Sequence, residues 1–329
     1  MTITYHLSYD MRAPSFGTPA GDLYSAAIDQ CAWADSRGFS SVTLSEHHAS
    51  DDGYLPSPIV LGAAIAGATE HLLVRLSVVL LPLHHPLKVA EDLAVLDLVS
   101  KGRLRLTVAG GYRPAEYAQF GVNMKRRPSL MEEGIEALKQ AWTGEPFEFR
   151  GETVRVLPRP HQRPRPSITL GGASPATARR AAAMCDGYEP LAPRLYEIYL
   201  EELDKLGKPK PEGARPPQGG PMALFVSEDP ERDWPRIAPH ALHETNSYGK
   251  WAAGMKGSVY AEFDDAEELR TSGRYLVLTP EECVEFAKDR SDVTLKPLMG
   301  GVDPSIGWTS MELFVDKVLP KLTVRACGR

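Results

Sequence analysis

Two pairs of adjacent histidines are the residues of this chain whose types and spacing indicate chemistry. Glu46, His47 and His48 follow one expected strand, and His84 and His85 follow the next. Adjacent side chains on an extended segment point to opposite sides, so at most one histidine of each pair faces a common centre. The H-x-H pattern of metal-dependent hydrolases is also missing from the first strand, and we expect no metal site. We expect His47 to hydrogen-bond or move a proton, and His84 and His85 to have structural roles.

A glycine-rich turn is the second feature that indicates a ligand. It consists of Gly171, Gly172, Ala173 and Ser174. The turn leads from the fifth expected strand into a helix, where free backbone amides and the helix dipole favour an anion, and one phosphate fits there. A plain strand–turn–helix junction without a ligand is the open alternative.

A second glycine pair, Gly110 and Gly111, comes directly after the fourth expected strand and is followed by Tyr112. Two residues without side chains allow a flat ring to lie against the backbone, with the tyrosine as a wall. A tight turn with no ligand explains the same residues equally well.

The elements that position these residues alternate regularly between short β-type runs and longer helical stretches. Candidate strands begin near Ile3, Ser41, Leu73, Arg103, Ser167, Gly187, Met222 and Thr294. Runs rich in Val and Leu indicate strands of a parallel sheet that is covered by helices. The pattern predicts an α/β fold with a single (β/α)₈ TIM barrel over residues 1–329, whose active site lies where the strands end. An open doubly wound sheet normally carries a glycine-rich turn after its first strand, and residues 9–14 contain no glycine.

Two intervals are too long for a plain strand–helix unit. Residues 145–166, before the fifth strand, have the pattern of a small hairpin followed by a proline-rich return. Residues 228–275, before the eighth strand, are polar with interleaved aromatic residues. A long segment after a barrel strand lies over the mouth, so we expect a lid there; a surface insertion without function is the alternative.

Composition excludes several classes of protein. The 37 Lys and Arg against 43 Asp and Glu give a net charge of −6, which argues against binding nucleic acid or an anionic membrane surface. The four cysteines form no C-x-x-C pattern. The longest apolar run, residues 58–68, is shorter than the ~20 residues that span a bilayer. The first residues lack a secretory signal, and we expect a soluble, cytoplasmic protein.

Four stretches of the chain, in this order, resemble the bacterial luciferase-like monooxygenase family. They are SVTLSEHHASDDGYLPSPIVLGAAIAGAT, LLPLHHPLKVAEDLAVLDLVSKGRLRLTVAGGYRPAEYAQFGV, SITLGGASPATARRAA and GWTSMELFVDKVLPKL. The resemblance implies a (β/α)₈ barrel that binds a flavin at its mouth, with the phosphate at the turn 171–174. It implies ring contacts at Ser77 and Val78, where members often have a non-proline cis peptide, and at Gly110 and Gly111. His47 falls where bacterial luciferase has a histidine implicated in proton handling.

The sequence also departs from luciferase itself. The reactive cysteine after the fourth strand is replaced by Ala109, and the phosphate-binding arginine beside it by Gly110. Light emission is therefore not expected, and another cation must neutralise the phosphate. Arg113, Arg126 and Arg127 are the candidates, with a solvated surface position as the alternative for each.

The implied function is a flavin-dependent monooxygenase. Reduced FMN, delivered by a separate flavin reductase, reacts with O₂ to give a flavin peroxide that oxygenates a small organic substrate. The expected substrate pocket contains His48, Leu81, Leu83 and Leu191, with Tyr112 beside them, because apolar residues exclude water. The resemblance also implies a homodimer packed through barrel helices. The helices 58–68 and 86–100 offer a face for it, and burial in the core is the alternative explanation of their apolar residues.

Two alternatives remain open. The first is a deazaflavin-dependent oxidoreductase that transfers hydride on the same barrel. The long anionic tail of a deazaflavin needs basic residues at the mouth, whereas the basic run from Arg150 to Arg165 precedes the fifth strand. The second is a non-catalytic flavin-binding protein, which we would expect to lack an intact set of motifs at the strand ends.

Overall fold

The computed structural model describes residues 3–211, 220–253 and 260–326, in which strands and helices alternate. The strands are β1 (Thr4–Tyr9), β2 (Ser41–Leu44), β3 (Leu73–Val79), β4 (Leu104–Val108), β5 (Phe147–Phe149), β6 (Glu152–Val154), β7 (Ile168–Gly172), β8 (Gly187–Pro190), β9 (Ala223–Val226), β10 (Tyr275–Leu278) and β11 (Asp292–Leu295). The first helices are α1 (Ala20–Asp35), α2 (Pro58–Ala68), α3 (Pro86–Val99), α4 (Pro114–Gln119), α5 (Arg127–Ala141) and α6 (Pro175–Met184). The later helices are α7 (Pro193–Lys205), α8 (Pro230–Trp251), α9 (Ala266–Thr271), α10 (Pro280–Ala287), α11 (Pro304–Leu313) and α12 (Leu319–Ala326).

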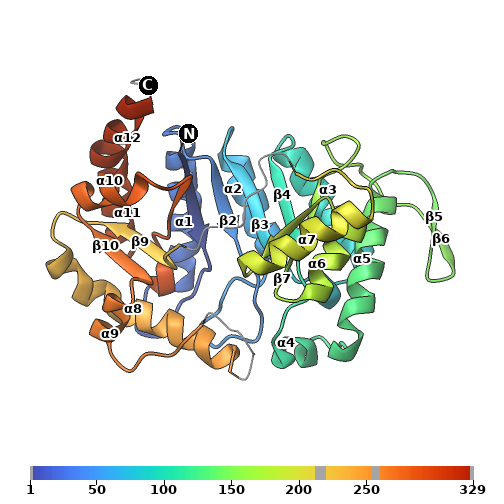
Figure 1. Cartoon of the computed structure of the whole chain (residues 1–329), viewed down its shortest axis with the longest axis horizontal. Coiled ribbons are helices and arrows are strands. Elements are labelled where there is room, and N and C mark those ends of the chain that lie inside the picture. Colours follow the sequence, from blue (N-terminus) through green and yellow to red (C-terminus); the bar gives the residue numbers. More distant parts are fainter. Residues whose placement is uncertain (1–2, 212–219, 254–259, 327–329) are drawn as a thin grey trace.

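The core of the molecule is a curled parallel sheet. Seven strands are hydrogen-bonded in the order β11-β1-β2-β3-β4-β7-β8, and β9 pairs in parallel with β10 in a second sheet. Strand β9 also contacts β11, which brings the second sheet beside the first. Because the strands are parallel, their carboxyl ends meet at one end of the sheet, where α4 and α8 also lie (Figure 1).

The predicted α/β class and all eight predicted strands are confirmed, but the strand arrangement differs from the expectation of one eight-stranded barrel. Strand β10 is an additional parallel strand, and the hydrogen bonds of the described residues divide the parallel strands between two sheets. Strand β10 begins at the end of the polar interval that we expected to form a lid, and its residues were therefore not identified as a strand. The observed architecture is therefore a curled parallel sheet with helices packed around it (Figure 1).

Local sequence explains several of the elements. All four residues of β9 are buried, as expected for a strand covered on both faces. Helix α6 begins with the side chain of Ser174 accepting a hydrogen bond from the backbone N–H of Thr177, and Thr279 caps α10 in a full capping box. A proline occupies the first turn of both helices, where its missing N–H needs no partner.

The two long intervals have different structures. Within 145–166, β5 and β6 form the expected antiparallel hairpin, which projects from the side of the molecule (Figure 1). Within 228–275, the 22-residue helix α8 and the short helix α9 replace the expected loop, and residues 254–259 lie outside the described part. Among the described helices, none combines the length and apolar character that a membrane span needs.

Candidate active site

A buried histidine–glutamate pair lies at the end of β2. The Nδ1 atom of His47 is 2.7 Å from Oε1 of Glu116, a residue in the first turn of α4. The backbone N–H of His48 donates to the same oxygen at 3.1 Å. Arg113 donates to the backbone oxygens of His48 and Ala49, and its Nη1 lies 3.4 Å from Glu116 Oε1. Sequence reasoning identified His47 and missed Glu116.

Several aromatic rings pack against the ring of His47. Its ring centroid lies 4.9 Å from that of Tyr54, 5.0 Å from Trp251 and 5.6 Å from Tyr112. Burial lowers the pKa of His47, and the hydrogen bond that Nδ1–H donates to Glu116 opposes that shift only in part. His47 is therefore neutral near pH 7. With Nδ1–H donated to the carboxylate, the Nε2 atom carries the free lone pair.

The glycine pair after β4 lies directly against this histidine–glutamate pair. A Cβ at Gly110 would be 2.8 Å from Cδ of Arg127, so no larger residue fits without moving the arginine. Gly111 has a φ of 64°, a backbone conformation that favours glycine, and its Cβ position is 3.7 Å from Oε2 of Glu116. Arg127 donates to the backbone oxygen of Gly111 at 2.6 Å.

The two glycines at the end of β7 lie next to the ends of β3 and β4. A Cβ at Gly171 would lie 3.2 Å from Val78 and 3.7 Å from Ala109, the residue before Gly110. The Ser77–Val78 peptide bond is cis, as the resemblance implied. The expected turn residues are thus neighbours of the β3 and β4 ends.

Two hydroxyl groups stand at the start of α6. Ser174 Oγ lies 2.9 Å from Thr177 Oγ1, and a Cβ at Gly172 would collide with Thr177. Ala173, which lies between Gly172 and Ser174 in the sequence, is exposed. Thr177 was not predicted, although it stands three residues after the cap, where a side chain of the first helical turn points back to the turn.

This surface is open to solvent although the strands that carry it are otherwise buried. Partly exposed residues at the strand ends are Ser77, Val78, Gly110, Gly111, Tyr112, Gly172 and Ser174. Two polar atoms beside them, Oε2 of Glu116 and the hydroxyl of Tyr112, are buried without a hydrogen-bond partner among the described residues. Buried polar atoms are normally paired, so these two atoms are available for hydrogen bonds to a polar ligand.

The apolar residues expected in the substrate pocket lie in different surroundings. Leu81 belongs to the main core and fills the space beside Gly134 of α5. Leu83 packs with Leu80 and Tyr117 in a separate small cluster, and Leu191 is 55% exposed. The structure does not gather them on one surface. The residues near His47 are aromatic instead.

Of the three candidate cations, Arg127 is the one on the glycine surface, through its contacts with Gly110 and Gly111. Arg113 is buried, and its guanidinium donates hydrogen bonds to two backbone oxygens of the loop after β2. Arg126 is exposed.

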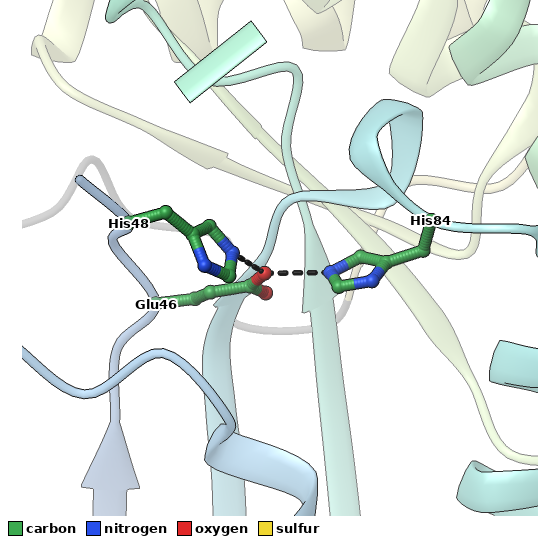
Figure 2. A group of neighbouring side chains, drawn as sticks. All are labelled: Glu46, His48 and His84. Atoms are coloured by element: carbon green, nitrogen blue, oxygen red, sulfur yellow. Dashed lines mark hydrogen bonds and ion pairs between the residues drawn. The ribbon is translucent and has the colours of Figure 1, made fainter. Parts of the chain in front are cut away.

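The other histidine of the first pair points away from the site. His48 and His84 both direct Nε2 to Oε1 of Glu46 at 2.6 Å, and Leu80 N–H donates to Oε2 at 2.9 Å (Figure 2). Burial acts to raise the pKa of Glu46, but these hydrogen bonds lower it to about 2. His48, expected in the substrate pocket, thus belongs to this cluster. His85 is exposed and packs on Phe149. One histidine of each pair, His48 or His84, therefore contacts Glu46, as expected for adjacent side chains on an extended segment.

Helix α8 is fixed across the strand ends by buried charges that sequence reasoning missed. Lys296, after β11, lies 2.6 Å from Glu244 of α8 and 2.9 Å from Asp10, after β1. His243 of α8 lies 2.7 Å from Asp52. Burial raises the pKa of Glu244 to about 7. These contacts place Trp251, at the end of α8, beside His47.

A cavity of about 500 Å³ lies between the loop after β2 and α8. Its lining includes the polar residues Asp52, Arg113, His243 and Lys250, together with Trp251. Because Trp251 also packs against the His47 ring, the cavity ends at the aromatic residues that cover the histidine.

The chain is similar to known proteins over most of its length. The sequence pattern of the luciferase-like monooxygenases matches residues 4–290. The oxygenase component of the flavin-dependent trigonelline monooxygenase from Acinetobacter baylyi is 31% identical over 46% of this chain and 44% of that protein. An F420-dependent glucose-6-phosphate dehydrogenase from Microbacterium testaceum is 27% identical over 99% of both chains. The solved structure of the monooxygenase RslO1 from Streptomyces bottropensis has a TM-score of 0.75 at 24% identity, over 97% of this chain and 99% of that one.

The chain spans about half the length of several curated relatives that it matches, such as 51% and 57% for two proteins from Sinorhizobium fredii. The family pattern itself covers most of the chain, which confirms the resemblance. The chain belongs to the luciferase-like monooxygenase family, which includes flavin- and F420-dependent monooxygenases and oxidoreductases.

Proposed function

We propose that this protein is a flavin-dependent monooxygenase that uses reduced FMN and O₂ to oxygenate a small organic substrate. The observation that carries the proposal is the contact between the glycine surface and the histidine–glutamate pair. Gly111 places backbone without a side chain next to Glu116, and Glu116 holds His47. A flat ring bound on the glycines therefore lies beside an oriented imidazole.

The residues present fit FMN. Ser174 and Thr177 offer hydroxyls at the positive end of α6, where a phosphate is stabilised. Arg127, at the neighbouring glycine pair, supplies the cation that luciferase carries at the position of Gly110. Oε2 of Glu116 and the hydroxyl of Tyr112, which have no partner among the described residues, would be available to hydrogen-bond polar groups of the ring. Reduced FMN supplies the electrons that activate O₂.

The chain contributes proton handling and exclusion of water. His47, neutral through burial and oriented by Glu116, accepts or returns a proton at Nε2. Tyr54, Tyr112 and Trp251 cover its ring and keep water out. Within segment 228–275, we propose helix α8 as the cover of the site, since it carries Trp251.

The substrate and partners follow from the same arrangement. A small organic molecule reaches the site through the cavity between the β2 loop and α8, whose end is Trp251. A separate reductase delivers reduced FMN, in keeping with the relative that is named as an oxygenase component.

We also propose a homodimer through α2 and α3. Helix α2 (PIVLGAAIAGA) has no polar side chain, which is typical of a helix buried on all sides. Yet Val60 is 72% exposed in the single chain, and Val95, Leu98 and Val99 of α3 are 40–47% exposed. A second copy of the chain covers these side chains.

A hydride-transferring F420-dependent oxidoreductase is the second candidate. The full-length similarity to an F420-dependent dehydrogenase supports it. The two functions differ in whether the bound cofactor reacts with O₂, and mixing each cofactor complex with O₂ separates them.

The FMN site is tested with two helix-capping residues. Ser174→Ala removes a hydroxyl at the proposed phosphate site, whereas Thr279→Ala removes the equivalent cap of α10. We expect Ser174→Ala to weaken reduced FMN about tenfold, the effect of a lost hydrogen bond to a charged group, and Thr279→Ala to leave affinity unchanged. Anaerobic fluorescence titration measures both. Equal affinity of the two variants and the wild type contradicts the site.

A further inference from the structure

The cluster of Glu46, His48 and His84 has no part in the proposed oxygenation. Its ligand-type atoms, Nε2 of each histidine and one carboxylate oxygen of Glu46, all lie within 4.8 Å of one another. Both imidazoles approach Oε1 of Glu46 at 2.6 Å from opposite sides, and their rings converge on it from the ends of two neighbouring strands (Figure 2). Two histidines and one carboxylate form a ligand set of zinc sites with an open position.

The dimensions are close to those of a zinc site. Zinc binds imidazole nitrogen and carboxylate oxygen at about 2.0–2.2 Å, which puts tetrahedral ligand atoms roughly 3.3 Å apart. The observed N–O separations of 2.6 Å are shorter than this value, so the His48 and His84 rings must move away from Oε1 when an ion enters between them. In doing so the ion replaces the protons that the two Nε2 atoms donate to Glu46.

The surroundings hold the carboxylate ready and leave one side accessible. Oε2 of Glu46 is fixed by the N–H of Leu80, so that Oε1 is the oxygen presented to the histidines. Such an outer hydrogen bond orients a ligand and supports metal affinity. Glu46 and His48 are buried, whereas the side chain of His84 is 29% exposed. The exposed side of His84 is therefore the side from which an ion would reach the cluster.

We infer that Glu46, His48 and His84 form a binding site for one divalent zinc-class metal ion. The site ties the end of β2 to the turn after β3. It is separate from the FMN surface, because His48 and His47 face opposite sides of the loop. Binding of the ion therefore does not depend on the cofactor.

Zinc binding is measured by isothermal titration calorimetry on the chelator-treated full chain without flavin. We expect one Zn²⁺ per chain at this site and a rise of the thermal unfolding midpoint, since the ion binds only the folded arrangement. Co²⁺ is expected to give the visible absorption of a tetrahedral site. Mg²⁺ prefers six oxygen ligands and is not expected to compete.

The matched variants are His84→Ala and His85→Ala. His85 is the sequence neighbour of His84 but is exposed against Phe149. We expect His84→Ala to weaken Zn²⁺ at least tenfold and His85→Ala to leave it unchanged. Glu46→Gln, with folding checked by circular dichroism, is expected to act like His84→Ala. Equal Zn²⁺ affinity in His84→Ala and wild type, or no stoichiometric binding to the wild type, overturns the inference.

Discussion

The Nδ1 atom of His47 and the Oε1 atom of Glu116 are 2.7 Å apart, although 69 residues separate them in the chain. The same oxygen accepts the backbone N–H of His48. Glu116 thereby fixes both the ring of His47 and the loop that carries it. The pair therefore leaves Nε2 as the nitrogen of His47 that is not bound to the carboxylate.

Replacing His47 tests its proposed role as a proton carrier. His47→Ala is expected to retain reduced FMN within about threefold of the wild-type affinity, because it leaves the glycine surface that we propose holds the ring unchanged. The rate at which O₂ reoxidises the bound flavin, followed by stopped-flow absorbance, is expected to change about a hundredfold, the usual contribution of a general acid or base. His71→Ala, whose side chain is 77% exposed, is the control. An unchanged rate in His47→Ala removes this residue from the chemistry.

Glu116→Gln tests the electrostatic side of the pair. The carboxylate raises the pKa of His47 against the larger effect of burial. Its loss therefore lowers the pKa of His47 further, and His47 stays neutral to lower pH. We expect the acid limb of the pH profile of the reoxidation rate to move to lower pH. The maximal rate is expected to fall roughly tenfold, because a neutral amide stabilises the protonated imidazole of His47 less than a carboxylate does. An acid limb at the wild-type position argues that Glu116 acts on packing alone.

The pH dependence of stability tests the buried charges under α8. Burial raises the pKa of Glu244 from 4.5 to about 7 in the folded chain. Between these values the unfolded chain ionises the group while the folded chain keeps its proton, so its stabilising contribution is lost as pH rises through 7. Urea unfolding is expected to show a smaller loss of stability from below pH 4.5 to above pH 7 in Glu244→Gln than in wild type. The exposed Glu201→Gln should behave as wild type; identical pH profiles of Glu244→Gln and wild type refute the assignment.

A charge on the outer face of α2 tests the dimer. Val60 is 72% exposed in the single chain, and a glutamate there would be buried in the proposed interface. Val60→Glu is expected to sediment as a monomer under conditions where the wild type sediments as a dimer. Leu206→Glu changes a leucine that is 46% exposed at the end of α7 and should remain dimeric. A monomeric wild type contradicts the proposal at once.

Features encoded by local sequence were predicted, and features made by distant residues were not. The glycine turns and the Ser174 cap depend on a few adjacent residues, and the structure has them where they were expected. Glu116 looked like an ordinary residue of a short helix, because its partner comes from another strand end. The Glu244–Lys296–Asp10 contacts join three separate elements in the same way.

Helix α8 and strand β10 were missed for a different reason. Pro235 and Pro239 lie inside α8 and break the usual sequence pattern of a helix. Buried contacts of Trp234, Ile237 and Ala241 stabilise the helix despite them. Strand β10 has four residues and gains its place by pairing with β9, which periodicity along one segment does not show.

The central claim, that the glycine surface beside His47 binds reduced FMN for reaction with O₂, is tested most directly by comparing cofactors. The full chain is titrated anaerobically with reduced FMN, oxidised FMN and F420, and each complex is then mixed with O₂ in a stopped-flow spectrophotometer. We expect one reduced FMN to bind per chain, at least tenfold more tightly than F420. The bound reduced FMN is expected to be reoxidised by O₂ at a rate that differs from that of free flavin. Tight binding of F420 with no binding of reduced FMN would contradict the central claim.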